Sequence, residues 1–136
     1  MLELLPETQG NVIAVKVYGT ITAIDYEEFM PGLEGRIADA APALGLVDWE
    51  EFEGWAADAE WYSFWYRVTN RRAFTRVAVI AGGKWGNEVE SLSRLLDRAS
   101  VRRFEPAERT VAWAWLLGGA DKTPMVESQN PAGARA

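Results

Sequence analysis

The densest group of side chains able to do chemistry lies near the middle of the chain, in the phrase DWEEFEGW. Its carboxylates are Asp48, Glu50, Glu51 and Glu53. Clustered carboxylates suit a hard cation, because Ca²⁺ and Mg²⁺ take oxygen ligands. The phrase lacks the alternating ligand spacing and the central glycine of a calcium loop. We therefore interpret it as a charged rim around the aromatic residues Trp49 and Phe52, and we predict no metal site.

A second group follows a strongly apolar run, in the phrase GGKWG at residues 82–86. Ligands of open α/β sheets bind where the carboxyl end of a strand leads into a helix, and helix N-termini favour anions. Lys84 would add a positive charge to such a site, and Trp85 an aromatic ring. The phrase is shorter than a P-loop and lacks its Lys-Ser/Thr ending. A plain turn with an exposed lysine is the simpler interpretation.

Catalysis is restricted because the chain contains neither cysteine nor histidine. This excludes disulfides, thiolate metal sites, cysteine nucleophiles and every mechanism that uses histidine as a base or metal ligand. An enzyme would have to use carboxylate, lysine, tyrosine or hydroxyl chemistry, with Asp48 or Lys84 as the first candidates. The net charge of −6 argues against nucleic acid, whose binding requires neutralised phosphates. We predict no cofactor.

These side chains must be positioned by a chain in which strands and helices alternate. Apolar runs predict a hairpin from residues 1–5 and 12–18, stopped at Gly19, and strands at 44–49, 74–81 and 101–104. Three- and four-residue spacings predict helices from Thr22 to residue 37 and at 55–71, 85–99 and 107–117. Thr22 is the predicted N-cap with Asp25 as its partner, and Pro31 predicts a kink or break. This order calls for a mainly parallel sheet covered by helices.

Several phrases resemble the SpoIIAA-like, or STAS-like, family of small bacterial proteins. They are the opening 37 residues, LVDWEEFEGW, RVAVIAGGKW and VRRFEPAERTVAWAWL. The resemblance covers residues 1–117 and implies an α/β domain, a βα superhelix whose mainly parallel sheet has four or five strands, an antiparallel N-terminal strand and flanking helices. Residues 118–136 are predicted to be a disordered tail, because they are polar and rich in proline and glycine.

One departure from the family can be read directly. The anti-sigma-factor antagonists of this fold have a phosphorylatable serine in a D-S-S-G-like phrase after the central strand. The corresponding residues 48–55 contain no serine or threonine. The glutamates there would also repel an added phosphate. Phosphorylation-controlled partner switching is therefore not expected.

The predicted helix at 55–71 has more aromatic side chains than one helix face can bury. They are Trp55, Trp61, Tyr62, Phe64, Trp65 and Tyr66. A helix that covers a sheet needs one apolar stripe, whereas these rings extend over most of its circumference. Core packing, contact with a second copy of the chain and contact with an apolar ligand all remain open. Contact with a second copy is the interpretation that we place first.

The first functional hypothesis is therefore a non-enzymatic binding or regulatory module that forms a homodimer through the aromatic helix and neighbouring loops. The second is a carrier of a small apolar ligand or lipid, which the similarity of this fold to lipid-transfer domains implies. An enzyme using Asp48 or Lys84 is the third. The N-terminus lacks the pattern of a signal peptide, and no apolar run approaches the roughly 20 residues of a membrane span. We expect a cytoplasmic protein without a transmembrane segment.

Overall fold

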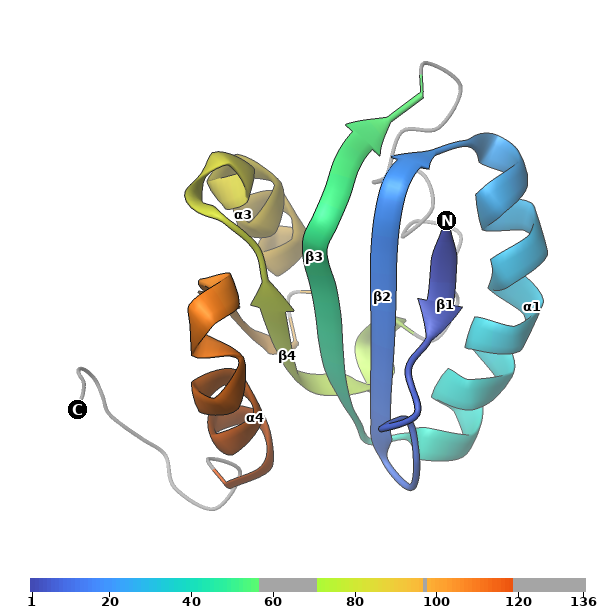
Figure 1. Cartoon of the computed structure of the whole chain (residues 1–136). Coiled ribbons are helices and arrows are strands. Elements are labelled where there is room, and N and C mark those ends of the chain that lie inside the picture. Colours follow the sequence, from blue (N-terminus) through green and yellow to red (C-terminus); the bar gives the residue numbers. More distant parts are fainter. Residues whose placement is uncertain (57–70, 97, 119–136) are drawn as a thin grey trace.

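The structure is a computed structural model that describes residues 1–56, 71–96 and 98–118. A five-stranded sheet runs through its centre in the order β1-β2-β3-β4-β5 (Figure 1). β1 pairs with β2 antiparallel, and the other neighbouring pairs are parallel. The strands are β1 (Leu2–Leu4), β2 (Val12–Ile21), β3 (Ala43–Trp55), β4 (Phe74–Ile80) and β5 (Ser100–Phe104). The predicted hairpin and mainly parallel α/β sheet are confirmed.

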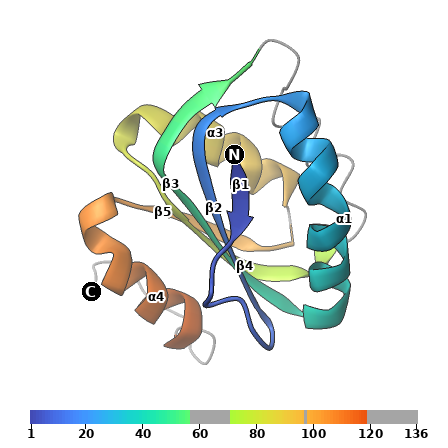
Figure 2. The ribbon, with the colours of Figure 1, turned by 45° about the vertical axis from the view of Figure 1, so that its right-hand side comes forward.

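Helices lie on both faces of this sheet. They are α1 (Ala23–Ala40), α3 (Gly86–Leu95) and α4 (Arg109–Gly118), with short 3-10 turns η1 (Arg71–Ala73), η2 (Gly83–Trp85) and η3 (Pro106–Glu108). α1 and α3 pack on one face, which we call the α1 face, and α4 packs on the other, the α4 face (Figures 1 and 2). The predicted helix at 55–71 is not confirmed at its ends, because Trp55 belongs to β3 and Arg71 begins η1. Its remaining part, residues 57–70, lies outside the described residues.

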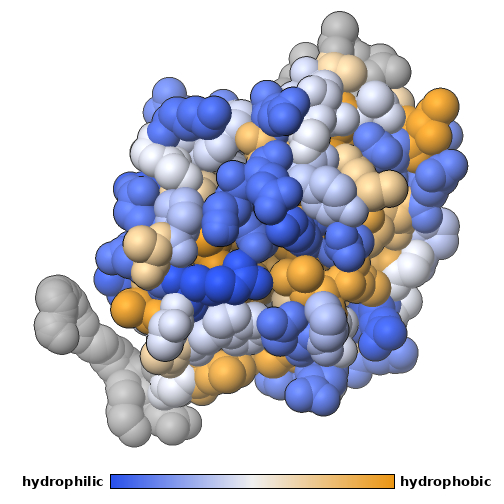
Figure 3. Space-filling model, in the orientation of Figure 1, coloured by the Kyte–Doolittle hydropathy of each residue, from blue (hydrophilic) through white to orange (hydrophobic). Residues whose placement is uncertain are grey.

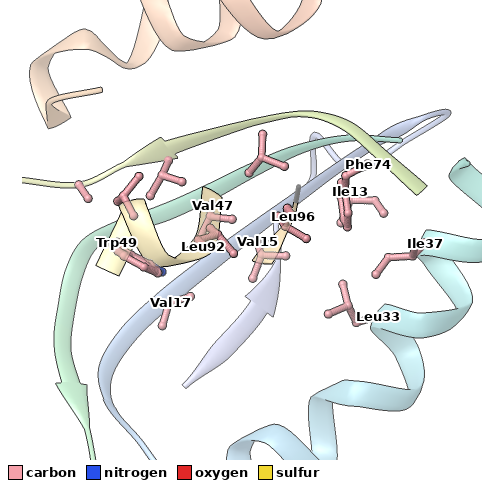
Figure 4. Packing of buried hydrophobic residues seen from close by; sticks show 14 of the residues in the cluster. Ile13, Val15, Val17, Leu33, Ile37, Val47, Trp49, Phe74, Leu92 and Leu96 are labelled. Carbon is pink, nitrogen blue, oxygen red and sulfur yellow. The ribbon is translucent and has the colours of Figure 1, made fainter. Parts of the chain in front are cut away.

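Alternating side chains of the strands build a core on each face. On the α1 face, Val15 of β2 belongs to one buried cluster with Leu33 of α1 and Leu92 of α3 (Figure 4). On the α4 face, Ala14 of β2 belongs to a second cluster with Leu116 of α4. Burying one such aliphatic side chain stabilises the fold by about 1.5–3 kcal/mol. Burial on both faces explains why the parallel strands are apolar along most of their length.

The start of α1 agrees with its predicted cap. The Thr22 hydroxyl accepts a hydrogen bond from the Asp25 N–H at 3.3 Å, and the Asp25 carboxylate accepts one from the Thr22 N–H at 2.8 Å. Such a capping box stabilises a helix by about 1 kcal/mol. The predicted break at Pro31 is wrong, because α1 continues to Ala40. Pro31 lies on the exposed side of α1, where water can satisfy the carbonyl that loses its partner.

Two predicted strand ends are also wrong, and a shared irregularity explains both. β2 continues through Gly19 to Ile21, and β3 continues past Trp49 to Trp55. Along this extension the pairing of β2 and β3 shifts twice, and each shift gives β3 one extra residue. Gly19 takes a φ of 70°, in the left-handed region that only glycine adopts readily. Gly19, which predicts the end of a strand in the sequence, therefore lies within a longer pair of strands and accommodates their bulge.

Candidate functional site

An aromatic cluster closes the carboxyl end of the sheet on the α1 face. It joins Trp49, Phe52 and Trp55 of β3 to Trp85 of η2. The shortest centroid distances are 4.5 Å between Phe52 and Trp55 and 4.7 Å between Phe52 and Trp85. Ring pairs in this range contribute about 0.5–1.5 kcal/mol beyond the burial of their area. The four rings therefore stabilise one another and form a single packed unit at this end of the sheet.

The bulges of β3 place these rings together. Side chains of a regular strand alternate between faces, so residues three apart in sequence point to opposite sides. The two register shifts each insert one residue, after Asp48 and after Phe52. Trp49, Phe52 and Trp55 consequently all pack with the core of the α1 face. The same spacing of three is also typical of a helix, but here it belongs to β3.

Trp49 and Phe52, which the predicted charged rim surrounds, are core residues with 4% exposure. Glu50, Glu51 and Glu53 of that rim are exposed, whereas Asp48 is buried. Trp55 and Trp85 are half-buried at the border of the cluster. Lys84 is exposed, as predicted for a plain turn, and its ammonium lies 5.2 Å from the centroid of the Trp85 ring. Among the residues that the structure describes, Trp55, Trp85 and the adjacent Lys84 are therefore the accessible part of this site. The other predicted aromatic contacts, Trp61, Tyr62, Phe64, Trp65 and Tyr66, lie outside the described residues.

A buried ion pair between Asp48 and Arg109 lies at the same sheet end on the α4 face. Its only signal in the sequence is the acidic Asp48 near the end of an apolar run. Asp48 is 2% exposed. One of its carboxylate oxygens accepts a hydrogen bond from the Arg109 guanidinium at 2.5 Å, and the other from the Glu50 N–H at 2.9 Å. Arg109 begins α4, so this pair ties the start of that helix to β3. Both carboxylate oxygens of Asp48 are thus engaged by neighbouring groups of the protein.

The three glutamates of the central phrase are exposed beside this ion pair. Glu50, Glu51 and Glu53 line an open groove together with Tyr18 and Gly19 of β2 and the edge of Phe52. The Glu51 carboxylate accepts a hydrogen bond from the Lys16 ammonium at 3.1 Å. This bond raises the pKa of Lys16, and the nearby carboxylates of Asp48 and Glu50 raise it further. Within the described ranges no group of acidic side chains has the arrangement of a metal site.

An apolar cavity of about 50 Å³ lies deeper on the α1 face, between α1 and the sheet. Its lining includes Val15 and Val17 of β2 and Leu33, which points from α1 toward the sheet in Figure 4. Tyr26 also contributes to the lining. Burial raises the pKa of its hydroxyl well above the ordinary value, and a hydrogen bond with the Trp55 side chain opposes part of that shift. The cavity therefore reaches from the core toward the aromatic cluster.

The face of the molecule seen in Figure 3 has mainly hydrophilic residues, with apolar patches between them. Among the residues that the structure describes, no helix is long and apolar enough to cross a membrane.

A five-stranded mixed sheet with helices on both faces defines a small α/β domain of the STAS-like kind. The model of the SpoIIAA-like family matches residues 12–117, and the chain therefore belongs to that family. A similar solved structure is an uncharacterised DUF3478-family protein with a SpoIIAA-like fold from Shewanella loihica PV-4. It is 23% identical, the alignment covers 85% of this chain and 92% of that one, and the TM-score is 0.68. A search of curated proteins gives no match.

Proposed function

We propose that the protein is a non-enzymatic binding or regulatory module whose contact surface includes the aromatic cluster at the carboxyl end of the sheet. The main support for this proposal is the way in which the rings of the cluster pack on one another. The half-buried rings of Trp55 and Trp85 rest on the fully buried rings of Trp49 and Phe52. Aromatic anchors that are held rigid by a core lose little conformational freedom on binding, and such residues dominate the energetics of interfaces.

The enzyme hypothesis has less support because its candidate residues, Asp48 and Lys84, contact different groups on opposite faces of the sheet. Asp48 is held by Arg109 on the α4 face. Lys84 lies over the Trp85 ring, which packs with the core of the opposite face. A general acid–base mechanism needs its groups within reach of one substrate atom. The contacts of Asp48 and Lys84 do not favour such an arrangement.

A second copy of the chain is the partner that we propose first, through the aromatic cluster and the aromatic residues among positions 61–66. Trp61→Gln combined with Trp65→Gln should convert the dimer to a monomer while the far-UV circular dichroism stays unchanged. Ile24→Gln is the matched control, because Ile24 is a large apolar residue of α1 that is 63% exposed. The control should remain dimeric. Size-exclusion chromatography with light scattering at micromolar concentration measures all three proteins, and a monomeric wild type would contradict the dimer.

A carrier of a small apolar ligand is the second candidate, and the cavity on the α1 face favours it. Its volume of about 50 Å³ is well below the roughly 300–1,000 Å³ of common small-molecule sites. The present shape therefore favours a ligand of a few apolar atoms over a complete lipid chain. Native mass spectrometry of the purified protein decides between the candidates. A bound small molecule would support the carrier, and a protein mass without an adduct would contradict it.

A further inference from the structure

β3 extends beyond its neighbour at the carboxyl end of the sheet. Its pairing with β4 ends at Asp48 opposite Ile80, whereas its pairing with β2 continues to Trp55 opposite Ile21. Figure 1 shows this end of β3 projecting past the end of β4. Within residues 50–54, Glu51, Phe52 and Gly54 pair with β2, and Glu50 and Glu53 are the extra residues of the two bulges. The opposite side of this segment is a sheet edge with which no described strand pairs.

No other described element pairs with that edge. Among the backbone hydrogen bonds of the described loops and turns, none involves Glu50 to Gly54. The Glu50 N–H is satisfied locally, by the Asp48 carboxylate. An open edge is a template on which an additional extended chain can add as a strand, with main-chain hydrogen bonds providing the affinity. The edge is short, and a short edge can serve as a specific docking site.

The charges on this segment determine which chain can add to it. Glu50, Glu51 and Glu53 are exposed, and only Glu51 forms an ion pair among the described residues, with Lys16. Asp48 is neutralised by Arg109. The segment consequently has an excess of negative charge. Like charges would oppose the pairing of this edge with its copy in a second chain, whereas a cationic strand would be attracted.

We propose that residues 50–54 of β3 bind an extended segment rich in lysine and arginine from a partner protein, by adding it as a sheet strand. This inference rests on the proposed binding function and names the chemical class of one partner.

A synthetic peptide of about eight residues that alternates lysine or arginine with valine is the probe, because natural strands have this length. Isothermal titration calorimetry should show saturable binding that weakens as salt is raised. The same peptide with N-methyl groups on alternate residues keeps its charge but cannot complete the ladder, and it should bind at least tenfold more weakly. Hydrogen exchange of the amides at residues 50–54 should slow when the unmodified peptide is bound.

Protein variants localise the binding. Glu50→Gln combined with Glu53→Gln should weaken peptide binding about threefold to tenfold, since exposed ionic contacts are individually modest. Glu27→Gln combined with Glu28→Gln changes the net charge equally on the exposed side of α1 and should leave the affinity within twofold. Equal binding of the N-methylated peptide, equal loss in both variants, or no binding would overturn the edge proposal. The aromatic surface is tested by light scattering, so failure of the peptide experiment leaves the proposed function standing.

Discussion

Replacing Arg109 by leucine should destabilise the protein by about 2–3 kcal/mol, because it leaves the Asp48 carboxylate buried without its counter-ion. Loss of one partner from a fully buried ion pair costs about 3–5 kcal/mol. The Arg109 side chain is 34% exposed, so water can enter the vacated space and reduce that cost. Leucine conserves the apolar part of the side chain, which separates the charge effect from lost packing. Urea denaturation followed by circular dichroism measures the change.

A double-mutant cycle tests the reasoning behind this number. Asp48→Leu with Arg109→Leu removes both charges, and the double variant should be more stable than Arg109→Leu alone. Arg94→Leu is the control, because Arg94 and Glu90 form an ion pair in which both side chains are about 70% exposed. Its cost should stay below about 0.5 kcal/mol. A cost of Arg109→Leu as small as that of the control would refute the claim that the ion pair supports α4.

Three further predictions concern Gly45, Tyr26 and the residues that follow Gly118. Gly45→Ala should cost about 1–3 kcal/mol in urea denaturation, because its new Cβ would lie 2.9 Å from the ring of Phe74; an unchanged midpoint would show that the ring moves freely. The raised pKa of Tyr26 means that the folded state keeps its proton above pH 10, where the unfolded chain loses it, so stability falls as the pH rises from there. Tyr26→Phe should flatten this fall, and an equal slope in both proteins would contradict the assignment. Truncation after Gly118 should leave the melting temperature nearly unchanged in calorimetry, and a loss of several degrees would show that the removed residues dock.

Much of the sheet could be predicted because its strands follow simple patterns. Residues 74–80 are a β-branched run bounded by turn signals, and the structure places β4 there. The capping pair Thr22 and Asp25 also acts locally, through hydrogen bonds within three residues. Features of this kind depend on neighbours in the chain, so the sequence is sufficient to predict them.

The end of β3 could not be predicted because its pattern depends on a partner strand. A spacing of three between Trp49, Phe52 and Trp55 is typical of helices and loops, and only the register against β2 turns it into one face of a bulged strand. The ion pair between Asp48 and Arg109 joins residues that are 61 positions apart. Nothing in the sequence around either residue indicates that the other is its partner. The candidate site is therefore a product of long-range pairing.

The placement of α4 has a consequence for synthesis of the chain. Every other described helix packs on the α1 face, and α4 follows all five strands in the sequence. Until α4 has left the ribosome, the sheet surface around Ala14, Leu46 and Ile80 has no described helix to cover it. A nascent chain paused before Arg109 would expose this surface to other chains, and such surfaces promote aggregation and chaperone binding. α4, which is translated after all five strands, thus ends the exposure of the second core.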